Sequence, residues 1–214
     1  MRDYSFSDQV CLGADHLLRF LAGQNLPHAH LRENPGKNIA EPELSLSEKK
    51  HVSGLMRVNY TGEVCAQALY QGQAITSRNI EIKKQLEQAG LEEIDHLFWC
   101  QSRLQDLDSH VSILNPIWYT VSFILGLTAG VCGDRWNLGF LEETEKQVTK
   151  HLEDHLEKLP AQDHKTRAIL EQMRDEESAH ADAAYHAGAA ELPKTIKNIM
   201  KYTSKFMTIL AYRI

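Results

Sequence analysis

The sequence lacks most of what a secreted or membrane-spanning chain needs. Its four cysteines contain no Cys-x-x-Cys pair, which excludes the usual zinc and dithiol motifs. No sustained apolar run lies near the N-terminus, so a signal peptide is not expected. The longest apolar stretch, residues 117–131, is shorter than the ~20 residues that span a bilayer. These absences predict a protein of a reducing, cytoplasmic compartment with no transmembrane segment.

Basic residues are outnumbered by acidic ones, 23 to 29, except at one end of the chain. The formal net charge is −6, which argues against a general nucleic-acid binder. Residues 194–214 nevertheless carry five basic side chains and no acidic one. An acidic body followed by a basic tail indicates that the tail has a function of its own.

Proline is rare after residue 42, and the long proline-free intervals favour long helices. Ser45 and Glu48 form a capping-box pattern that opens a helix over about 46–76. Asn115 and Pro116 are typical of an N-cap followed by proline in the first turn. The other expected helices cover about 7–21, 78–108, 134–159, 163–190 and 194–214, and three glycines break the apolar segment that Pro116 opens.

No period-two strand pattern stands out, so the fold class is all-α. We expect a four-helix bundle of the ferritin-like type with an N-terminal helix, an apolar insert and a C-terminal amphipathic helix. The corresponding segments are 1–44 for the N-terminal helix and linker, 45–192 for the bundle with its insert at 113–132, and 193–214 for the terminal helix.

The chemistry lies in glutamates and histidines that occupy the apolar stripes of four predicted helices. Each stripe contains one glutamate at core-facing spacing, and two of the stripes add a histidine three residues later. The six residues are Glu63, Glu93, His96, Glu145, Glu177 and His180. A third Glu-x-x-His, Glu48 and His51, is explained by the helix cap.

Four carboxylates and two imidazoles directed inward are costly to bury without compensation. One Glu from each of two helices, with Glu-x-x-His from each of the other two, is the ligand set of di-iron bundles. Imidazole and carboxylate donors suit iron or manganese. The 30- and 32-residue spacings from Glu63 to Glu93 and from Glu145 to Glu177 predict two helix hairpins with equivalent ligands.

Some assignments stay open at this point. Glu142 and Glu143 compete with Glu145 for the ligand position on the third helix. His151, Asp95 and Asp175 are candidates to hold the ligands from outside, and for Asp95 and Asp175 an ordinary surface role is equally favoured. His155 and His186 are expected at the surface.

Two elements predict contact with a membrane. Lys194, Lys197, Lys201 and Lys205 fall on one side of the terminal helix, opposite an apolar side that includes Phe206; such a helix can lie in a bilayer interface. Residues 117–131 supply a second apolar surface, with aromatic residues at its start. The alternative is an amphipathic helix packed on its own bundle.

Six segments resemble the bacterial demethoxyubiquinone hydroxylases. They are MRVNYTGEVCAQALYQGQA (56–74), EEIDHLFWC (92–100), LNPIWY (114–119), GDRWNLGFLEETEKQV (133–148), MRDEESAH (173–180) and MTILAYRI (207–214). The resemblance covers about 41–214 and, weakly, the N-terminal helix. Tyr60 departs from the family pattern, which usually has histidine at that position.

The resemblance implies a di-iron monooxygenase of ubiquinone biosynthesis that uses O₂ to hydroxylate the demethoxyubiquinol ring. It places two iron ions on the same six ligands, Glu145 included, and puts His151 beside the site. It further implies a polyprenyl quinol substrate, peripheral attachment to the cytoplasmic face of the bacterial inner membrane, and contact with other ubiquinone-biosynthesis proteins. No G-x-G-x-x-G motif is present, so electrons are expected from a separate reductase, a quinone mediator or the quinol itself.

Three other functions share parts of this pattern. A ferritin-like iron-oxidation or storage protein has the same ligand set but needs neither apolar element. A membrane-docked scaffold with a vestigial metal site would bind quinone without turnover. A di-iron hydroxylase acting on tRNA or lipid is possible on fold alone, although the acidic body argues against tRNA.

Overall fold

The computed structural model describes Asp8 and residues 32–214. The helix expected over 7–21 lies outside the described residues. Within them the chain is helical and contains no strand, in agreement with the predicted fold class. The helices are α2 (Leu46–Thr76), α3 (Ile80–Asp106), α4 (Asn115–Val131), α5 (Asp134–Lys158), α6 (His164–His186) and α7 (Lys194–Ala211).

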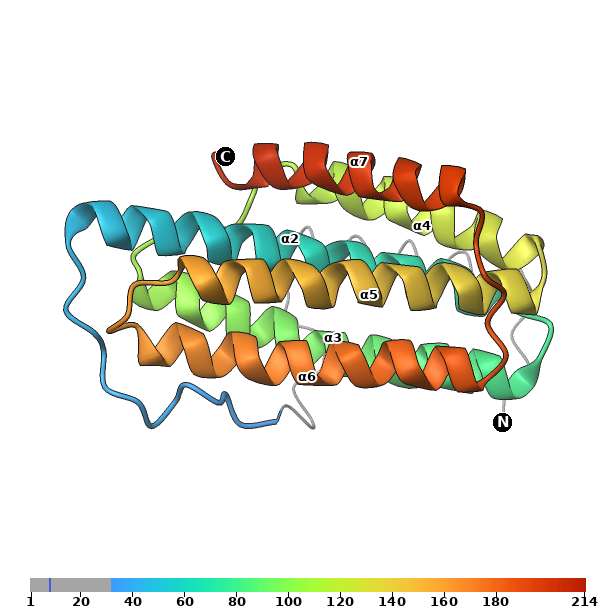
Figure 1. Cartoon of the computed structure of the whole chain (residues 1–214), viewed down its shortest axis with the longest axis horizontal. Coiled ribbons are helices and arrows are strands. Elements are labelled where there is room, and N and C mark those ends of the chain that lie inside the picture. Colours follow the sequence, from blue (N-terminus) through green and yellow to red (C-terminus); the bar gives the residue numbers. More distant parts are fainter. Residues whose placement is uncertain (1–7, 9–31) are drawn as a thin grey trace.

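Four of these helices form the bundle, and the other two cover one side of it. Figure 1 shows α2, α3, α5 and α6 running lengthwise, with α4 and α7 along one edge. The hairpin partners α2 and α3 pack on each other, as do α5 and α6, while α4 lies along α2. The main core cluster draws on α2, α3, α5 and α6, for example through Met56, Leu104, Leu152 and Leu170.

The helix ends follow local chemistry, with three differences from the expectations. Gly126 and Gly130 do not break the apolar segment, because both lie inside α4, which continues to Val131. The Ser45 and Glu48 capping box is present. Asn115 is the first residue of α4 rather than its N-cap, because its side-chain oxygen accepts a hydrogen bond from Thr61 of α2 at 2.8 Å. α6 ends at His186, four residues earlier than expected, because Gly188 adopts a positive φ of 96° that terminates the helix.

The contact between α2 and α4 is a close approach of two backbones. A Cβ atom on Gly72 would overlap the backbone at Phe123, and one on Gly126 would overlap the carbonyl oxygen of Leu69. Gly126 and Gly130 form the G-x-x-x-G of the apolar segment, and both are buried. These glycines therefore hold α4 against the bundle, which leaves its other face exposed.

The C-terminus is fastened to the start of α2. The ring of Tyr212 lies over Gly54, and its hydroxyl is 2.7 Å from Nδ1 of His51. The backbone oxygen of Tyr212 accepts a hydrogen bond from Arg57 at 3.0 Å. His51 thus serves to hold α7 and takes no part in the Glu/His cluster.

Candidate metal centre

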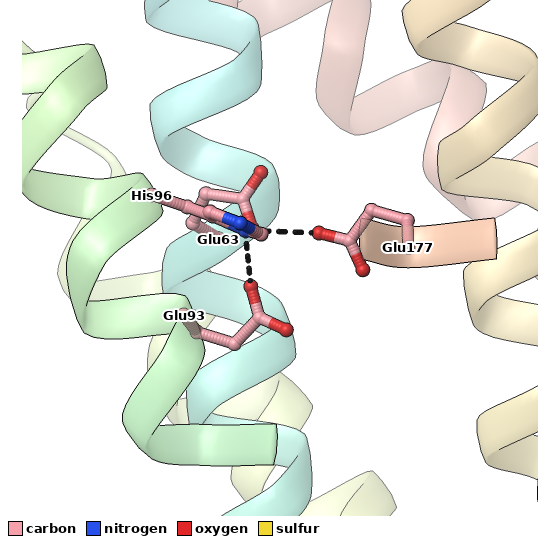
Figure 2. Close-up of side chains that lie close together, drawn as sticks. All are labelled: Glu63, Glu93, His96 and Glu177. Carbon is pink, nitrogen blue, oxygen red and sulfur yellow. Dashed lines mark hydrogen bonds and ion pairs between the residues drawn. The ribbon is translucent and has the colours of Figure 1, made fainter. Parts of the chain in front are cut away.

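The six predicted residues come from all four helices of the bundle. Glu63 lies on α2, Glu93 and His96 on α3, Glu145 on α5, and Glu177 and His180 on α6. All are buried except His180, which is half-buried. Figure 2 shows Glu63, Glu93 and Glu177 converging on the ring of His96.

The residues form two overlapping groups. In one group Glu63, Glu93, His96 and Glu177 each offer an atom within 4.8 Å of the others. In the second, Glu93, Glu145, Glu177 and His180 do the same. Because Glu93 and Glu177 belong to both groups, the arrangement offers two adjacent cation positions with two carboxylates able to bridge them.

Among the histidines, Nδ1 is the ring nitrogen that faces the cluster. Nδ1 of His96 lies 3.0 Å from Glu93, 3.1 Å from Glu177 and 3.8 Å from Glu63. Nδ1 of His180 lies 3.4 Å from Glu177 and 3.6 Å from Glu93. Both rings therefore present the same atom to the space between the carboxylates.

The pKa values of these groups are shifted by burial and by the charges of their neighbours. Burial, helped by the nearby carboxylates, raises the pKa of Glu63 and of Glu145 well above the ordinary range. Burial also opposes ionisation of Glu177, but hydrogen bonds from His180 and His96 lower the pKa of this carboxyl. Burial lowers the pKa of His180, yet its contacts with Glu177 and Glu93 outweigh this and raise it to about 9. A divalent cation would relieve the repulsion that displaces these values.

Unpaired atoms point to the same conclusion. Among the described residues, both carboxylate oxygens of Glu145 and one oxygen of Glu93 are buried without a hydrogen-bond donor. Buried oxygens of this kind are costly unless a cation or a donor reaches them. The oxygen and imidazole donors, with no thiolate among the grouped residues, fit iron or manganese.

The structure brings Glu145, and neither Glu142 nor Glu143, into these groups. Glu142 pairs with Lys146. Glu143 pairs with Lys197 of α7 at 3.3 Å and accepts a hydrogen bond from Gln147 at 2.8 Å. The alternatives thus have partners outside the cluster.

Two outer carboxylates were missed in the sequence analysis. Nε2 of His96 lies 2.7 Å from Glu176, and Nε2 of His180 lies 2.7 Å from Glu92. Each directly precedes a cluster glutamate of the opposite hairpin, so the motif is Glu-Glu-x-x-His on both helices. Such contacts fix the ring and leave the other nitrogen for a metal. The pair of consecutive glutamates in each motif was the sequence signal that could have identified these outer carboxylates.

The other candidates for this outer role lie differently. Asp95 accepts a hydrogen bond from Arg32, whose Nε lies 2.5 Å from Oδ2 of the carboxylate. Asp175 is exposed and pairs with Arg174. His151 packs on His155 at a ring-centroid distance of 3.9 Å, and within the described residues its Nε2 has no hydrogen-bond partner. The placement of His151 beside the metals therefore stays a prediction.

His155 is not at the surface, contrary to expectation, whereas His186 is exposed as predicted. His155 is 4% exposed because it neighbours the stripe of Leu152, Leu156 and Leu159 that packs into the core. Burial, and then the adjacent His151, lower the pKa of His155 to about 2. Burial likewise lowers the pKa of His151 to about 4.

Acid should therefore destabilise this protein through the His151–His155 pair. An unfolded histidine titrates near 6.5, so below that pH the unfolded state binds more protons and the free energy of unfolding falls. For His155 the loss between pH 7 and pH 5 is about 2 kcal/mol. Replacement by leucine should remove that part of the pH dependence in denaturant unfolding. His186→Leu, at an exposed position, is the control, and a His155→Leu variant with the wild-type pH dependence would contradict the assignment.

These features first define a class of protein: an all-helical bundle whose core offers carboxylate and imidazole donors for metal ions. A sequence model of the family described as "Ubiquinone biosynthesis protein COQ7" matches residues 50–211. The chain belongs to this family, and it is an oxidoreductase of the hydroxylase class.

Several curated relatives are similar over most of their length. A protein of Legionella pneumophila is 52% identical over 216 residues, with both chains fully covered. One of Nitrosomonas eutropha is 52% identical over 205 residues, covering 96% of this chain and 97% of the relative. One of Chromobacterium violaceum is 55% identical over 183 residues, covering 86% and 89%. All three are named 3-demethoxyubiquinol 3-hydroxylase.

Proposed function

We propose that this protein is a di-iron, O₂-dependent monooxygenase that hydroxylates the ring of 3-demethoxyubiquinol. The observation that carries the proposal is the pair of overlapping donor groups that share Glu93 and Glu177. The names of the relatives supply the substrate. One oxygen atom of O₂ would replace a ring hydrogen as hydroxyl, and the other would leave as water with two electrons and two protons from a donor. Bound iron supplies the redox chemistry that activates O₂.

The chain's own residues hold and shield this centre. Glu63 and His96 would bind one iron, Glu145 and His180 the other, and Glu93 and Glu177 would bridge the two. Glu92 and Glu176 orient the imidazoles from outside through Nε2. The buried walls of the bundle exclude bulk water, which strengthens every electrostatic contact in the site.

The substrate is an apolar molecule, and we propose that α4 and α7 dock the protein on the membrane that contains it. No helix in the described part of the chain is both long enough and apolar enough to span a bilayer. The two helices nevertheless expose apolar side chains, and the rings of Trp118 and Phe206 contact each other between them, with centroids 6.3 Å apart. The exposed members are Ile117, Val121, Ile124 and Leu125 on α4 and Ile199, Tyr202, Phe206 and Ile209 on α7.

The outward face of α7 fits an anionic membrane. Lys194, Lys201 and Lys205 are exposed beside the apolar residues. Met200, Met207 and Leu210 are half-buried instead. The helix thus packs on its own bundle and still presents an apolar face outward, which leaves a face available for the proposed docking on a membrane. Lysines at such a border favour anionic headgroups.

Phe206→Ser should weaken binding to vesicles that contain anionic lipid by about tenfold, because it removes one large side chain from the docking face. Phe206 is 60% exposed, so the fold should not depend on it. Tyr185→Ser is the matched control, since Tyr185 is 62% exposed but lies on α6. Vesicle co-sedimentation measures both, and equal binding by the two variants would contradict this docking surface.

The rival function, iron oxidation and storage, shares the donor cluster but has no use for the exposed α4–α7 surface. Oxygen uptake separates the two. A hydroxylase should consume O₂ in proportion to added short-chain demethoxyubiquinol and bind two irons per chain. A storage protein should consume O₂ in proportion to added Fe(II) alone and accumulate many irons, which would overturn the proposal.

A further inference from the structure

The two outer carboxylates of the cluster, Glu176 and Glu92, are held by different contacts. Glu176 and Glu92 occupy matching places, each 2.7 Å from the outer nitrogen of a cluster histidine. Glu176 also receives a forked ion pair from Arg32, with Nη1 and Nη2 at 2.6 and 2.8 Å from its two oxygens. Glu92 accepts a hydrogen bond from Gln88 at 2.9 Å, and no arginine or lysine forms an ion pair with it within the described residues.

Arg32 is itself held in place by its neighbours. Its backbone nitrogen donates to Asp95 at 3.1 Å, and its Nε lies 2.5 Å from the same carboxylate. Its guanidinium carbon lies 5.1 Å from the ring centre of Trp99, whose indole donates to the carbonyl oxygen of Arg32 at 3.4 Å. Trp99 in turn packs on His96 with ring centres 5.3 Å apart. These contacts leave the guanidinium little freedom to turn away from Glu176.

The ion pair between Arg32 and Glu176 has no equivalent in the other half of the internal repeat, as far as the described residues show. The two hairpins supply equivalent donors, but Arg32 precedes both of them in sequence. In the described part of the chain it forms an ion pair with Glu176 and none with Glu92, on which its charge acts only from a distance. A fixed carboxylate on the outer nitrogen holds the imidazole plane and directs Nδ1 at the metal. His96 is fully buried, whereas the side chain of His180 is 13% exposed. The imidazole of His96 is therefore restrained by more contacts than that of His180.

We propose that Arg32 is a positioning residue that makes the two metal positions inequivalent, so that the position of Glu63 and His96 retains its iron longer than the position of Glu145 and His180. This inference rests on the proposed function, because it needs two irons in the cluster. It assigns to the segment before the bundle a role in the order in which metal is gained and lost.

The test is the release of iron to a chelator from anaerobic protein loaded with ⁵⁷Fe(II). Wild type should lose iron in a fast and a slow phase. In Arg32→Ala the slow phase should accelerate several-fold, while the fast phase stays unchanged. The effect should be smaller than the roughly 10- to 100-fold cost of removing an outer partner that bonds a ligand directly, as Glu176 does. Mössbauer spectra of partly depleted wild type should show one iron environment, and those of the variant should show both.

Three further variants make the test specific. Arg32→Lys, which keeps the charge but not the fork, should restore the slow phase in part. Gln88→Ala, on the Glu92 side, should leave the slow phase intact. In a Glu176→Gln background, removing Arg32 should have no additional effect, because Arg32 acts through Glu176.

The possible outcomes distinguish a failure of the role of Arg32 from a failure of the proposed di-iron function. Wild type that binds fewer than two irons would contradict the proposed function, and this inference with it. Two irons that leave wild type in a single phase would overturn the inference alone. So would an Arg32→Ala variant that loses both irons faster by the same factor together with a lower melting temperature, since that is the result of a general loosening of the fold.

Discussion

Glu145→Gln is expected to abolish hydroxylation. After removal of metal, the variant is expected to be more stable than wild-type protein treated in the same way. The variant loses a ligand of one iron, so metal content should fall from two per chain to one or none. Turnover should fall on the order of 10³-fold or more, because a lost ligand removes several kcal/mol of metal-based stabilisation. The metal-free variant should gain stability because burial and the nearby charge of Glu177 oppose ionisation of Glu145. A neutral amide that can donate a hydrogen bond to Glu177 removes this cost, which is worth about 1–3 kcal/mol.

Glu143→Gln is the matched control for this result. Glu143 lies two residues away on the same helix, but it contacts Lys197 and Gln147 rather than the cluster. It should keep both irons and near wild-type turnover. Metal analysis, turnover and denaturant unfolding of the chelated proteins measure the whole pattern. A Glu145→Gln variant that retains two irons and full activity would move the ligand to another glutamate.

Gly126→Ala is expected to destabilise the protein by about 3 kcal/mol, at the upper end for overpacking. The added Cβ would meet the carbonyl oxygen of Leu69, which is backbone and cannot rotate away. The melting temperature should fall by roughly 10 °C for a chain of this size. Vesicle binding should also weaken, because α4 carries half of the docking surface and would be displaced from α2.

Gly90→Ala offers the comparison, since it makes the same change in an open place. A Cβ there would lie 3.8 Å from Tyr70, an ordinary contact. In a helix interior this exchange should stabilise by about 0.5–1 kcal/mol. Scanning calorimetry of both variants tests the close packing of α2 and α4, and a Gly126→Ala protein as stable as wild type would contradict it.

The sequence was sufficient to predict the parts of this molecule that depend on local periodicity. The capping box at Ser45, the long helices and the inward direction of the six cluster residues all follow from spacing along a single helix. His155 shows the limit of that approach. It lies beside a leucine stripe, and only the packing of neighbouring helices decides whether such a border position is buried.

The contacts that support the cluster could not be predicted in the same way. Glu92 and Glu176 are on the outer side of their helices, where glutamate is ordinarily a surface residue. Each acquires its role from a histidine on the opposite hairpin, about 80 residues away. Arg32 lies in a proline-rich linker with no periodicity to interpret, and its contact with Glu176 depends on the tertiary path of that linker.

The most direct test of the whole account is single-turnover hydroxylation under ¹⁸O₂. Protein loaded with two Fe(II) per chain is given short-chain demethoxyubiquinol, and the product is analysed by mass spectrometry. We expect a hydroxylated ring that carries one ¹⁸O atom, with Glu143→Gln active and Glu145→Gln inactive. A product that carries oxygen from water, or iron oxidation with the quinol unchanged, would contradict the monooxygenase assignment.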